Sequence, residues 1–178
     1  MKVRNTKFKD LKIIQQKKHG DSRGYLRETF KKDIIKWDKL VFDYATTSKK
    51  NVLRGFHFQS KFKQAKYVSV LKGKIIDCAL DLRKKSRTFG KVFKIELSDK
   101  NCKSLYIPEG FAHAYFSMSK LNIIYYKLSN YYHPEFEDGI LWNDKSLKVK
   151  WPTKKPIVSK KDKKLKTFLN FKKIYKGI

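Results

Sequence analysis

Short segments in which apolar and polar residues alternate follow one another closely between residues 41 and 132, and this pattern constrains the fold strongly. Strands are predicted at residues 41–47, 52–58, 65–71, 74–82, 92–97 and 121–132. In the fourth segment Ile76, Cys78 and Leu80 share one parity, which is the two-residue period of a strand. Short polar or Gly-containing links separate the segments. The sequence therefore predicts an all-β domain, built as an antiparallel sandwich or barrel.

The first 30 residues are predicted to form an N-terminal arm. Leu11, Ile13 and Ile14 form a short apolar patch that is consistent with a strand. Residues 19–24 contain two Gly residues and an Asp-Ser pair, which favour a turn. Residues 24–30 then alternate as a strand does.

Helical structure is predicted in two places only. Residues 33–40 could form one or two helical turns, and residues 159–169 are expected to form a C-terminal helix. Ser159 is a suitable N-cap, and Asp162 falls in the first turn, where a carboxylate is favourable. The strands between them define a core over residues 40–152. With 178 residues, 40% hydrophobic composition and no repeat or linker, residues 1–178 are predicted to form one domain.

The formal net charge of the chain is +28, from 44 Lys and Arg residues against 16 Asp and Glu residues. Such a charge raises a nucleic acid or an anionic surface as the partner. However, only six of the cations are Arg, the residue that best suits phosphate and base-edge recognition, and the Lys residues are spread over the whole chain. The composition favours a solvated basic surface that attracts a negatively charged substrate, without a nucleic-acid partner.

The two cysteines, Cys78 and Cys102, do not make a disulfide framework, and reduced thiols in a cytoplasmic protein are the simpler interpretation. The N-terminus has no apolar export segment, and no 18 apolar residues run together. The sequence therefore predicts a cytoplasmic protein with no membrane partner.

Two segments place polar groups between apolar strands. Residues 52–73 contain Arg54, His57, Gln59, Gln64 and Lys66, and residues 107–116 contain His113. His57 and His113 are two of only four histidines, and each lies in an apolar and aromatic segment. We expect the two imidazoles to face each other across one cavity.

Residues 108–113, Pro-x-Gly-x-x-His, resemble the second motif of the cupin barrels, which ends in a metal-ligating histidine. The first cupin motif has His-x-His and then a Glu seven residues before a Gly. Here His57-Phe58-Gln59 takes the first place and Lys66 stands seven residues before Gly73. Two imidazoles, an amide and an ammonium are poor ligands for a divalent metal, so a metal-free pocket without a cofactor is predicted. A metal-dependent cupin oxygenase is the alternative.

Without a metal, His57 is a natural general base near neutral pH, provided that a carboxylate fixes its tautomer and stabilises the imidazolium. The candidate carboxylates are Asp77, Asp81, Asp144 and Asp162. The sequence does not choose among them.

Several longer stretches resemble the successive signatures of the dTDP-4-dehydrorhamnose 3,5-epimerase family, in its order and over about residues 20–165. They include GDSRGYLRETF, VLRGFHFQ, LYIPEGFAHAYF, NYYHPEFEDGILWNDKSLKVKWP and VSKKD. The resemblance implies a cupin-like jelly-roll β-barrel with short peripheral helices, and a homodimer in which an N-terminal strand joins the partner's sheet. It also implies cofactor-independent inversion of C3, C5 or both, next to the C4 ketone of a nucleotide-diphosphate-linked 6-deoxy sugar. Such sugars are precursors of capsule or O-antigen polysaccharides.

The same resemblance assigns roles to single residues. His57 matches the general base, Asp162 the carboxylate paired with it, Lys66 the cation beside the C4 oxygen, and Tyr132 the acid on the opposite face. The positions that match substrate-binding residues are Arg23, Glu28, Arg54, Gln59 and His113. Tyr131 is a rival for the acid because it stands next to Tyr132.

These roles agree with the chemistry. A proton on carbon next to a ketone is weakly acidic, so the enolate must be stabilised, and one preorganised cation can contribute roughly 3 to 4 kcal/mol. Lys66 can do this without a metal. A phenol with a pKa near about 10 keeps its proton at neutral pH and can return it to the other face of the carbon.

Four positions depart from the family pattern: Ala114 and Asn51 each replace a Gly, and Phe42 and Tyr44 replace polar residues. The family usually has Gln and Asn on the strand before VLRG, where this chain has Phe42 and Tyr44. Aromatic side chains can stack on a base but cannot replace amide hydrogen bonds. This departure favours another nucleotide, such as GDP, in place of dTDP. Three further functions fit the same sequence: an epimerase that inverts only C3 of a GDP-linked heptose, a 3,4-ketoisomerase, and a non-catalytic nucleotide-sugar-binding barrel.

Overall fold

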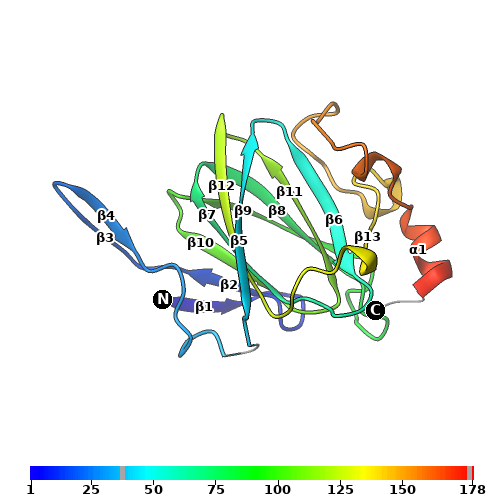
Figure 1. The fold of residues 1–178 in the computed structure, drawn as a ribbon, viewed down its shortest axis with the longest axis horizontal. Coiled ribbons are helices and arrows are strands. Elements are labelled where there is room, and N and C mark those ends of the chain that lie inside the picture. Colours follow the sequence, from blue (N-terminus) through cyan, green and yellow to red (C-terminus); the bar gives the residue numbers. More distant parts are fainter. Residues whose placement is uncertain (37–38, 176–177) are drawn as a thin grey trace.

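A computed structural model describes residues 1–36, 39–175 and 178 of the chain. The described residues form two facing antiparallel sheets and a separate hairpin (Figure 1). One sheet has the strand order β1-β2-β10-β7-β12-β5, the other has the order β13-β6-β11-β8-β9, and β3 pairs with β4. The architecture is the predicted cupin-like jelly roll.

The strands of the six-stranded sheet are β1 (Lys2–Asn5), β2 (Lys12–Gln15), β5 (Phe42–Lys49), β7 (Lys66–Lys72), β10 (Lys103–Ile107) and β12 (Leu121–Leu128). Those of the five-stranded sheet are β6 (Leu53–Gln59), β8 (Lys74–Asp81), β9 (Val92–Ser98), β11 (Phe111–Ser117) and β13 (Glu137–Gly139). The hairpin consists of β3 (Lys18–Asp21) and β4 (Gly24–Arg27). Each strand predicted between residues 41 and 97 is present within two residues of its expected bounds.

The helical predictions were less accurate. The described helices are the 3₁₀ turns η1 (Pro134–Phe136), η2 (Lys145–Leu147) and η3 (Asp162–Lys164), and the helix α1 (Phe168–Tyr175). The C-terminal helix predicted at 159–169 is wrong in its position: Ser159 does accept a hydrogen bond from the Asp162 amide at 3.0 Å, but only the 3₁₀ turn η3 follows, and its N-cap is Lys161. Residues 33–36 and 39–40 contain no helix, and residues 37 and 38 lie outside the described residues.

The predicted strand over residues 121–132 is four residues too long, because β12 ends at Leu128 and a loop follows. Gln64 explains part of this ending. Its amide Nε2 donates to the carbonyls of Asn130 and Tyr131 at 3.1 and 2.9 Å, so the loop bonds to a side chain instead of continuing the ladder. The loop leads directly to the functional cavity.

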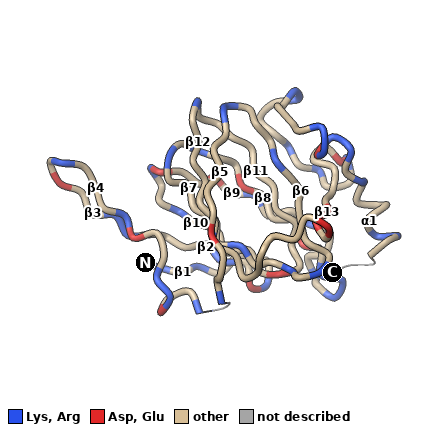
Figure 2. Tube along the Cα trace, in the orientation of Figure 1, with Lys and Arg blue, Asp and Glu red and all other residues tan. Residues whose placement is uncertain are grey.

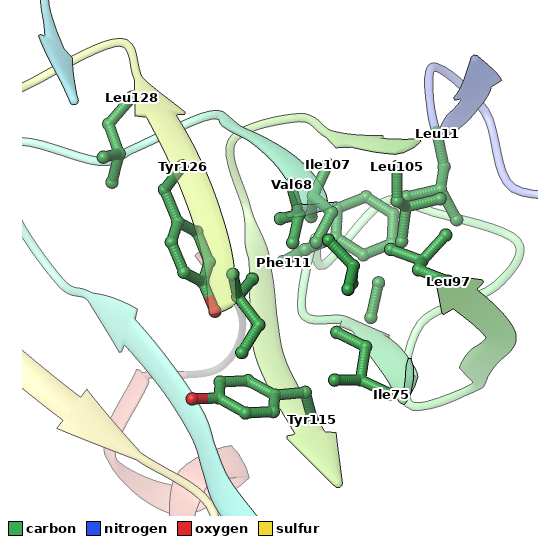
Figure 3. Packing of buried hydrophobic residues seen from close by; sticks show 13 residues of the cluster. Leu11, Val68, Ile75, Leu97, Leu105, Ile107, Phe111, Tyr115, Tyr126 and Leu128 are labelled. Carbon is green, nitrogen blue, oxygen red and sulfur yellow. The ribbon is translucent and has the colours of Figure 1, made fainter. Parts of the chain in front are cut away.

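The main core lies between the two sheets and explains why they face each other. Apolar side chains from both sheets are fully buried there, including Val68, Leu105 and Ile124 from one sheet and Ile75 and Leu97 from the other. Figure 3 shows that Tyr115, Tyr126 and Leu128 lie on the side of this cluster away from Leu11, and the two tyrosines also line the cavity described below. Burial of such side chains contributes about 1.5–3 kcal/mol each. The tyrosines mark the change from a packed core to a polar cavity.

A second core covers the outer face of the five-stranded sheet. Cys78, Leu80 and Leu82 of the β8 region pack there against Phe168 and Phe171 of α1. Strand β8 is therefore buried on both faces: its most apolar parity faces the C-terminal segment, and the opposite parity faces the interior of the barrel. This leaves Asp77 free to point inward, toward the site.

The hairpin β3–β4 extends away from the body of the molecule (Figure 1). Its Tyr25 and Leu26 are 51% and 64% exposed, which is unusual for large apolar side chains. Lys and Arg are distributed over all parts of the chain trace in Figure 2, as the sequence indicates. Among the described residues, no helix is long and apolar enough to cross a membrane.

Candidate active site

A cavity of about 330 Å³ lies between the two sheets at the tyrosine end of the core. Its lining residues come from β5, β7 and β12 of one sheet and from β6, β11 and β13 of the other, together with the loop after β12. They are Phe42, Tyr44, Thr46, Arg54, His57, Phe58, Gln59, Gln64, Lys66, His113, Tyr115, Tyr126, Tyr132 and Glu137. The structure thus brings most of the predicted site residues into one cavity.

His57 has the carboxylate partner that a general base needs. Its Nε2 lies 2.8 Å from Oδ1 of Asp162, which is 3% exposed, so Asp162 is the one of the four candidate aspartates that pairs with His57. The Gly55 amide donates to the other carboxylate oxygen at 3.2 Å. Burial raises the pKa of Asp162, but these hydrogen bonds and the nearby imidazole outweigh it, and the pKa lies below its usual value. Asp162 is therefore ionised and can stabilise the imidazolium of His57.

Gly55 allows this close approach of strands. Its backbone has φ +105°, and a Cβ there would lie 2.3 Å from the carbonyl oxygen of His113. A side chain at this position would push β6 from β11 and displace His57. The Gly in the RGFH segment is thus required by packing.

His113 forms a second buried imidazole–carboxylate pair. Its Nε2 lies 2.5 Å from Oδ1 of Asp77, and both side chains are almost fully buried. The predicted arrangement of the two histidines was wrong in one respect. His57 and His113 are paired neighbours on the adjacent strands β6 and β11, so they stand side by side on one wall and do not face each other across the cavity.

Lys66 enters the cavity from the opposite sheet. It is the first residue of β7, and Val68 and Val70 on the same parity belong to the main core. Burial lowers the pKa of Lys66 to about 8, although the charges of Glu137 and Asp77 oppose this shift. An ammonium in such surroundings interacts strongly with a new negative charge, because water screens it little.

Tyr132, and not its rival Tyr131, lines the cavity. Tyr131 is not among the lining residues, and its ring packs against Phe42 at a centroid distance of 6.0 Å. The hydroxyl of Tyr132 donates to Oε2 of Glu137 at 3.0 Å. Burial and this hydrogen bond raise the pKa of Tyr132, so the phenol stays protonated at neutral pH.

Gln59 lines the cavity, but its amide is used to hold the loop of Tyr132. Its Nε2 donates to the carbonyl of Phe62 at 2.7 Å and to that of Tyr131 at 3.3 Å, and its Oε1 accepts from the His133 amide at 2.7 Å. The predicted substrate contact of Gln59 therefore competes with three bonds to the chain. We assign to this residue the positioning of the loop.

Arg54, Phe42 and Tyr44 form the wall next to the edge strand β5. Nε of Arg54 donates to Ser48 Oγ at 3.3 Å and its Nη2 donates to the Thr47 carbonyl at 3.4 Å, so the guanidinium is held beside β5. The ring of Tyr44 stacks on that of Tyr126 at 4.9 Å and packs against Phe42 at 5.6 Å. The amides expected from the family pattern are thus replaced by a continuous aromatic surface.

Arg23 and Glu28 do not reach the cavity within this chain. Arg23 lies in the turn of the hairpin β3–β4, and its side chain is 89% exposed and paired with Asp21. Glu28 directly follows β4, and its amide donates to the Lys17 carbonyl at 3.0 Å. Arg23 belongs to the projecting hairpin and Glu28 directly follows it, and neither residue is among those that line the cavity.

Sequence reasoning missed Thr46, Tyr115, Tyr126, Glu137 and Lys161. The first three lie on strands at the parity that faces the interior, so strand parity could have indicated them once the strands were registered. Glu137 and Lys161 pair with each other across 24 residues, and no local pattern indicates this. Among residues 1–36, 39–175 and 178, no group of three His, Cys, Asp or Glu side chains is arranged to hold a metal ion.

The fold and the cavity define a class of protein, a cupin-like barrel whose cavity is lined by a carboxylate-paired histidine, a buried lysine and a tyrosine. The family model described as dTDP-4-dehydrorhamnose 3,5-epimerase matches residues 5–170. The chain belongs to this family, and it is a nucleotide-sugar 3,5-epimerase.

Individual relatives agree with this assignment. The chain is 41% identical to the dTDP-4-dehydrorhamnose 3,5-epimerase of Methanothermobacter thermautotrophicus, over 86% of this chain and 87% of the relative. It resembles the structure of the Legionella pneumophila enzyme in complex with dTDP-4-keto-L-rhamnose, with a TM-score of 0.89, 39% identity and coverage of 93% and 92%. The Bacillus anthracis enzyme, with TDP and pyrophosphate bound, gives a TM-score of 0.90, 36% identity and coverage of 94% and 99%.

The comparisons support the epimerase and a nucleotide-sugar partner. They give no support to a GDP-heptose C3-epimerase, a 3,4-ketoisomerase or a non-catalytic barrel.

Proposed function

We propose that this epimerase acts on a dTDP-linked 4-keto-6-deoxy sugar, with His57 as base, Lys66 as enolate stabiliser and Tyr132 as acid. The observation that supports this most directly is that all three side chains line one cavity and that His57 is backed by the buried Asp162.

The reaction begins when His57 removes the proton from a ring carbon next to the C4 ketone. Asp162 holds one ring nitrogen and stabilises the imidazolium that forms. The electron pair moves onto the C4 oxygen, where the ammonium of Lys66 stabilises the enolate by roughly 3 to 4 kcal/mol.

Tyr132 then donates its phenolic proton to the same carbon from the other face, and the carbon is inverted. His57 lies on strand β6, whereas Tyr132 comes from the loop after β12, so the two groups can approach a sugar ring from different sides. The phenolate that remains takes a proton from solvent, and the imidazolium of His57 releases one to solvent, which restores both groups. The same groups can act on C3 and on C5, because both carbons are next to the ketone.

The nucleotide is proposed to be dTDP, because relatives that match most of the chain are named for dTDP-linked sugars. Arg54 lines the cavity, and its guanidinium is proposed to bind the diphosphate. Phe42 and Tyr44 are proposed to form an apolar wall along the bound nucleotide sugar. The product would be a precursor of a surface polysaccharide, made in the cytoplasm, where nucleotide sugars are synthesised.

A homodimer is also proposed. The projecting hairpin exposes Tyr25 and Leu26, and it places Arg23 where it could complete the cavity of a second copy of the chain. Arg23 and Glu28 would then bind the nucleotide of the partner's site.

Proton NMR of the reaction in deuterated buffer tests the proposal, because each inverted carbon must take up one deuteron. His57→Asn should lose turnover by about 10² to 10⁴-fold while it still binds dTDP in calorimetry. Normal turnover by His57→Asn would refute the role of His57 as the base. Tighter binding of GDP than of dTDP would refute the proposed nucleotide.

A further inference from the structure

Glu137 is the acidic side chain among the residues that line the cavity. A carboxylate is unfavourable in a cavity that must hold a diphosphate and an enolate, because like charges repel at short distance. A carboxylate in this cavity must therefore be neutralised by a neighbouring cation, and its presence indicates that it has a role in the site.

Lys161 provides the compensation. Its ammonium forms an ion pair with Oε2 of Glu137, and the Glu137 side chain is only 16% exposed. Burial raises the pKa of Glu137, but Lys161, His57 and Tyr132 outweigh it and keep the pKa below the usual value. Glu137 is thus an anion that is neutralised locally and remains able to accept hydrogen bonds.

The hydrogen bond from Tyr132 indicates the role of Glu137. Its hydroxyl donates to the same oxygen, Oε2 of Glu137, at 3.0 Å. The Tyr132 side chain lies in a loop and is half exposed, so its ring needs an anchor to stay at one face of the substrate. Glu137 itself is fixed by β13, which pairs with β6 in the register Glu137–Gln59 and Gly139–His57. The strand that carries His57 therefore also sets the position of the acid.

One short turn serves both proton-handling groups. Asp162 bonds to His57 and the preceding residue, Lys161, bonds to Glu137. The turn thus connects the base and the acid through adjacent side chains.

We propose that Glu137, held by Lys161, is a positioning residue that fixes the phenol of Tyr132 opposite His57 and so makes inversion prevail over simple proton exchange. The inference rests on the proposed roles of His57 and Tyr132. It concerns how their action is coordinated.

The experiment separates two events that follow removal of the proton. In deuterated buffer, inversion places deuterium on the new face, whereas return of a solvent deuteron from His57 places it on the original face with retention. Both products are resolved by proton NMR. If Glu137 acts only through Tyr132, its removal should lower inversion and spare exchange.

We expect Glu137→Ala to lower the rate of inversion about 10- to 100-fold, as a misplaced reacting group does. Exchange with retention should change less than about threefold, so the ratio of exchange to inversion should rise. Glu137→Gln keeps an oxygen acceptor and should restore the ratio to within about threefold of the wild type. In a Tyr132→Phe background, Glu137→Ala should add no further loss of inversion.

Glu135→Ala is the matched control, because Glu135 is an exposed acid two residues away that pairs with His133 Nδ1 at 3.5 Å. The ratio of exchange to inversion in Glu135→Ala should equal that of the wild type. Equal losses of exchange and inversion in both Glu137 variants, or additive losses in the Tyr132→Phe background, would overturn the inference. If the wild type neither exchanges nor inverts, the proposed function itself fails. If the wild type both exchanges and inverts, and Glu137→Ala has the same ratio of exchange to inversion as Glu135→Ala, only the inference about Glu137 is refuted.

Discussion

The two histidines of the cavity each have a buried carboxylate behind them, and this repeated pair sets the chemistry at the scale of single residues. Asp162 lies 2.8 Å from His57, and Asp77 lies 2.5 Å from His113. A carboxylate partner orients an imidazole and favours its charged form. With Lys66 on the facing sheet, the cavity combines groups that accept a proton with a group that stabilises negative charge.

The charge of Lys66 predicts how activity depends on pH. Burial lowers the pKa of Lys66 to about 8, so the ammonium is present below this pH and is lost above it. Only the ammonium stabilises the enolate, and kcat/KM should therefore fall about tenfold per pH unit above about pH 8.

Lys66→Arg supplies the control for this prediction. A guanidinium stays charged at every accessible pH. Its kcat/KM should be lower than that of the wild type but should not decline between about pH 8 and pH 9.5. A wild-type profile that is flat over this range would show that the pKa of Lys66 does not limit the reaction.

At the scale of elements, the cavity is made by two sheets and one loop, and side chains from neighbouring segments hold the loop in place. Gln59 and Gln64 donate to its carbonyls, and Gln59 also accepts from the His133 amide. The loop therefore depends on β6 and on the segment before β7 for its conformation. The same dependence places Tyr132 at the cavity.

Gln59→Leu should disturb this loop while it retains the bulk of the side chain. The Phe62 carbonyl and the His133 amide would lose this partner, whereas the Tyr131 carbonyl would keep its bond from Gln64. A group that is left without a partner away from water costs about 1–3 kcal/mol. We expect a lower melting temperature, and a kcat that falls more than binding of dTDP does, since Tyr132 is displaced and Arg54 is not.

Gln15→Leu is a matched control. Gln15 in β2 donates to the Asn101 carbonyl at 2.9 Å, far from the cavity. This variant should lose stability without loss of kcat. Equal kcat in the wild type and in Gln59→Leu would contradict the role that we assign to Gln59.

At the scale of the whole molecule, the hairpin β3–β4 is the part that projects furthest from the body of a single chain (Figure 1). It exposes Tyr25 and Leu26 and contains Arg23. In the proposed dimer these side chains are covered by the partner, and Arg23 serves the partner's cavity. Two large apolar side chains exposed together on a projecting hairpin would otherwise be unfavourable.

Mixed dimers test whether Arg23 acts across the interface. Arg23→Ala and His57→Asn should each be poorly active alone, because every site contains one defect. When the two variants are unfolded, mixed and refolded together, hybrid dimers should contain one intact site and one doubly defective site. Random pairing should then restore about a quarter of wild-type activity. No recovery, in mixtures shown by native mass spectrometry to contain hybrids, would mean that Arg23 acts within its own chain or not at all.

The sequence by itself determined the family, the strands β5 to β9 and most of the predicted residues of the cavity, but it did not indicate β1, β10, β11 or β13. Alternating parity is a local property, so β5 to β9 could be placed from neighbouring residues alone. The segments that contain His57, Lys66 and His113 are also local, and they were sufficient to predict the cavity. The helix at the C-terminus was misplaced because packing of Phe168 and Phe171 against β8, and not the cap at Ser159, determines where it forms.

Only the tertiary structure decided which of the candidate groups meet. His57 and Asp162 are 105 residues apart, and four aspartates were equivalent until the fold buried one of them beside the imidazole. The choice of Tyr132 over Tyr131, the loop-holding bonds of Gln59 and the pair of Glu137 with Lys161 likewise depend on contacts between distant segments. The physical reason is that strand patterns reflect short-range periodicity, whereas a site is formed by side chains that meet only when the sheets close around a common interior.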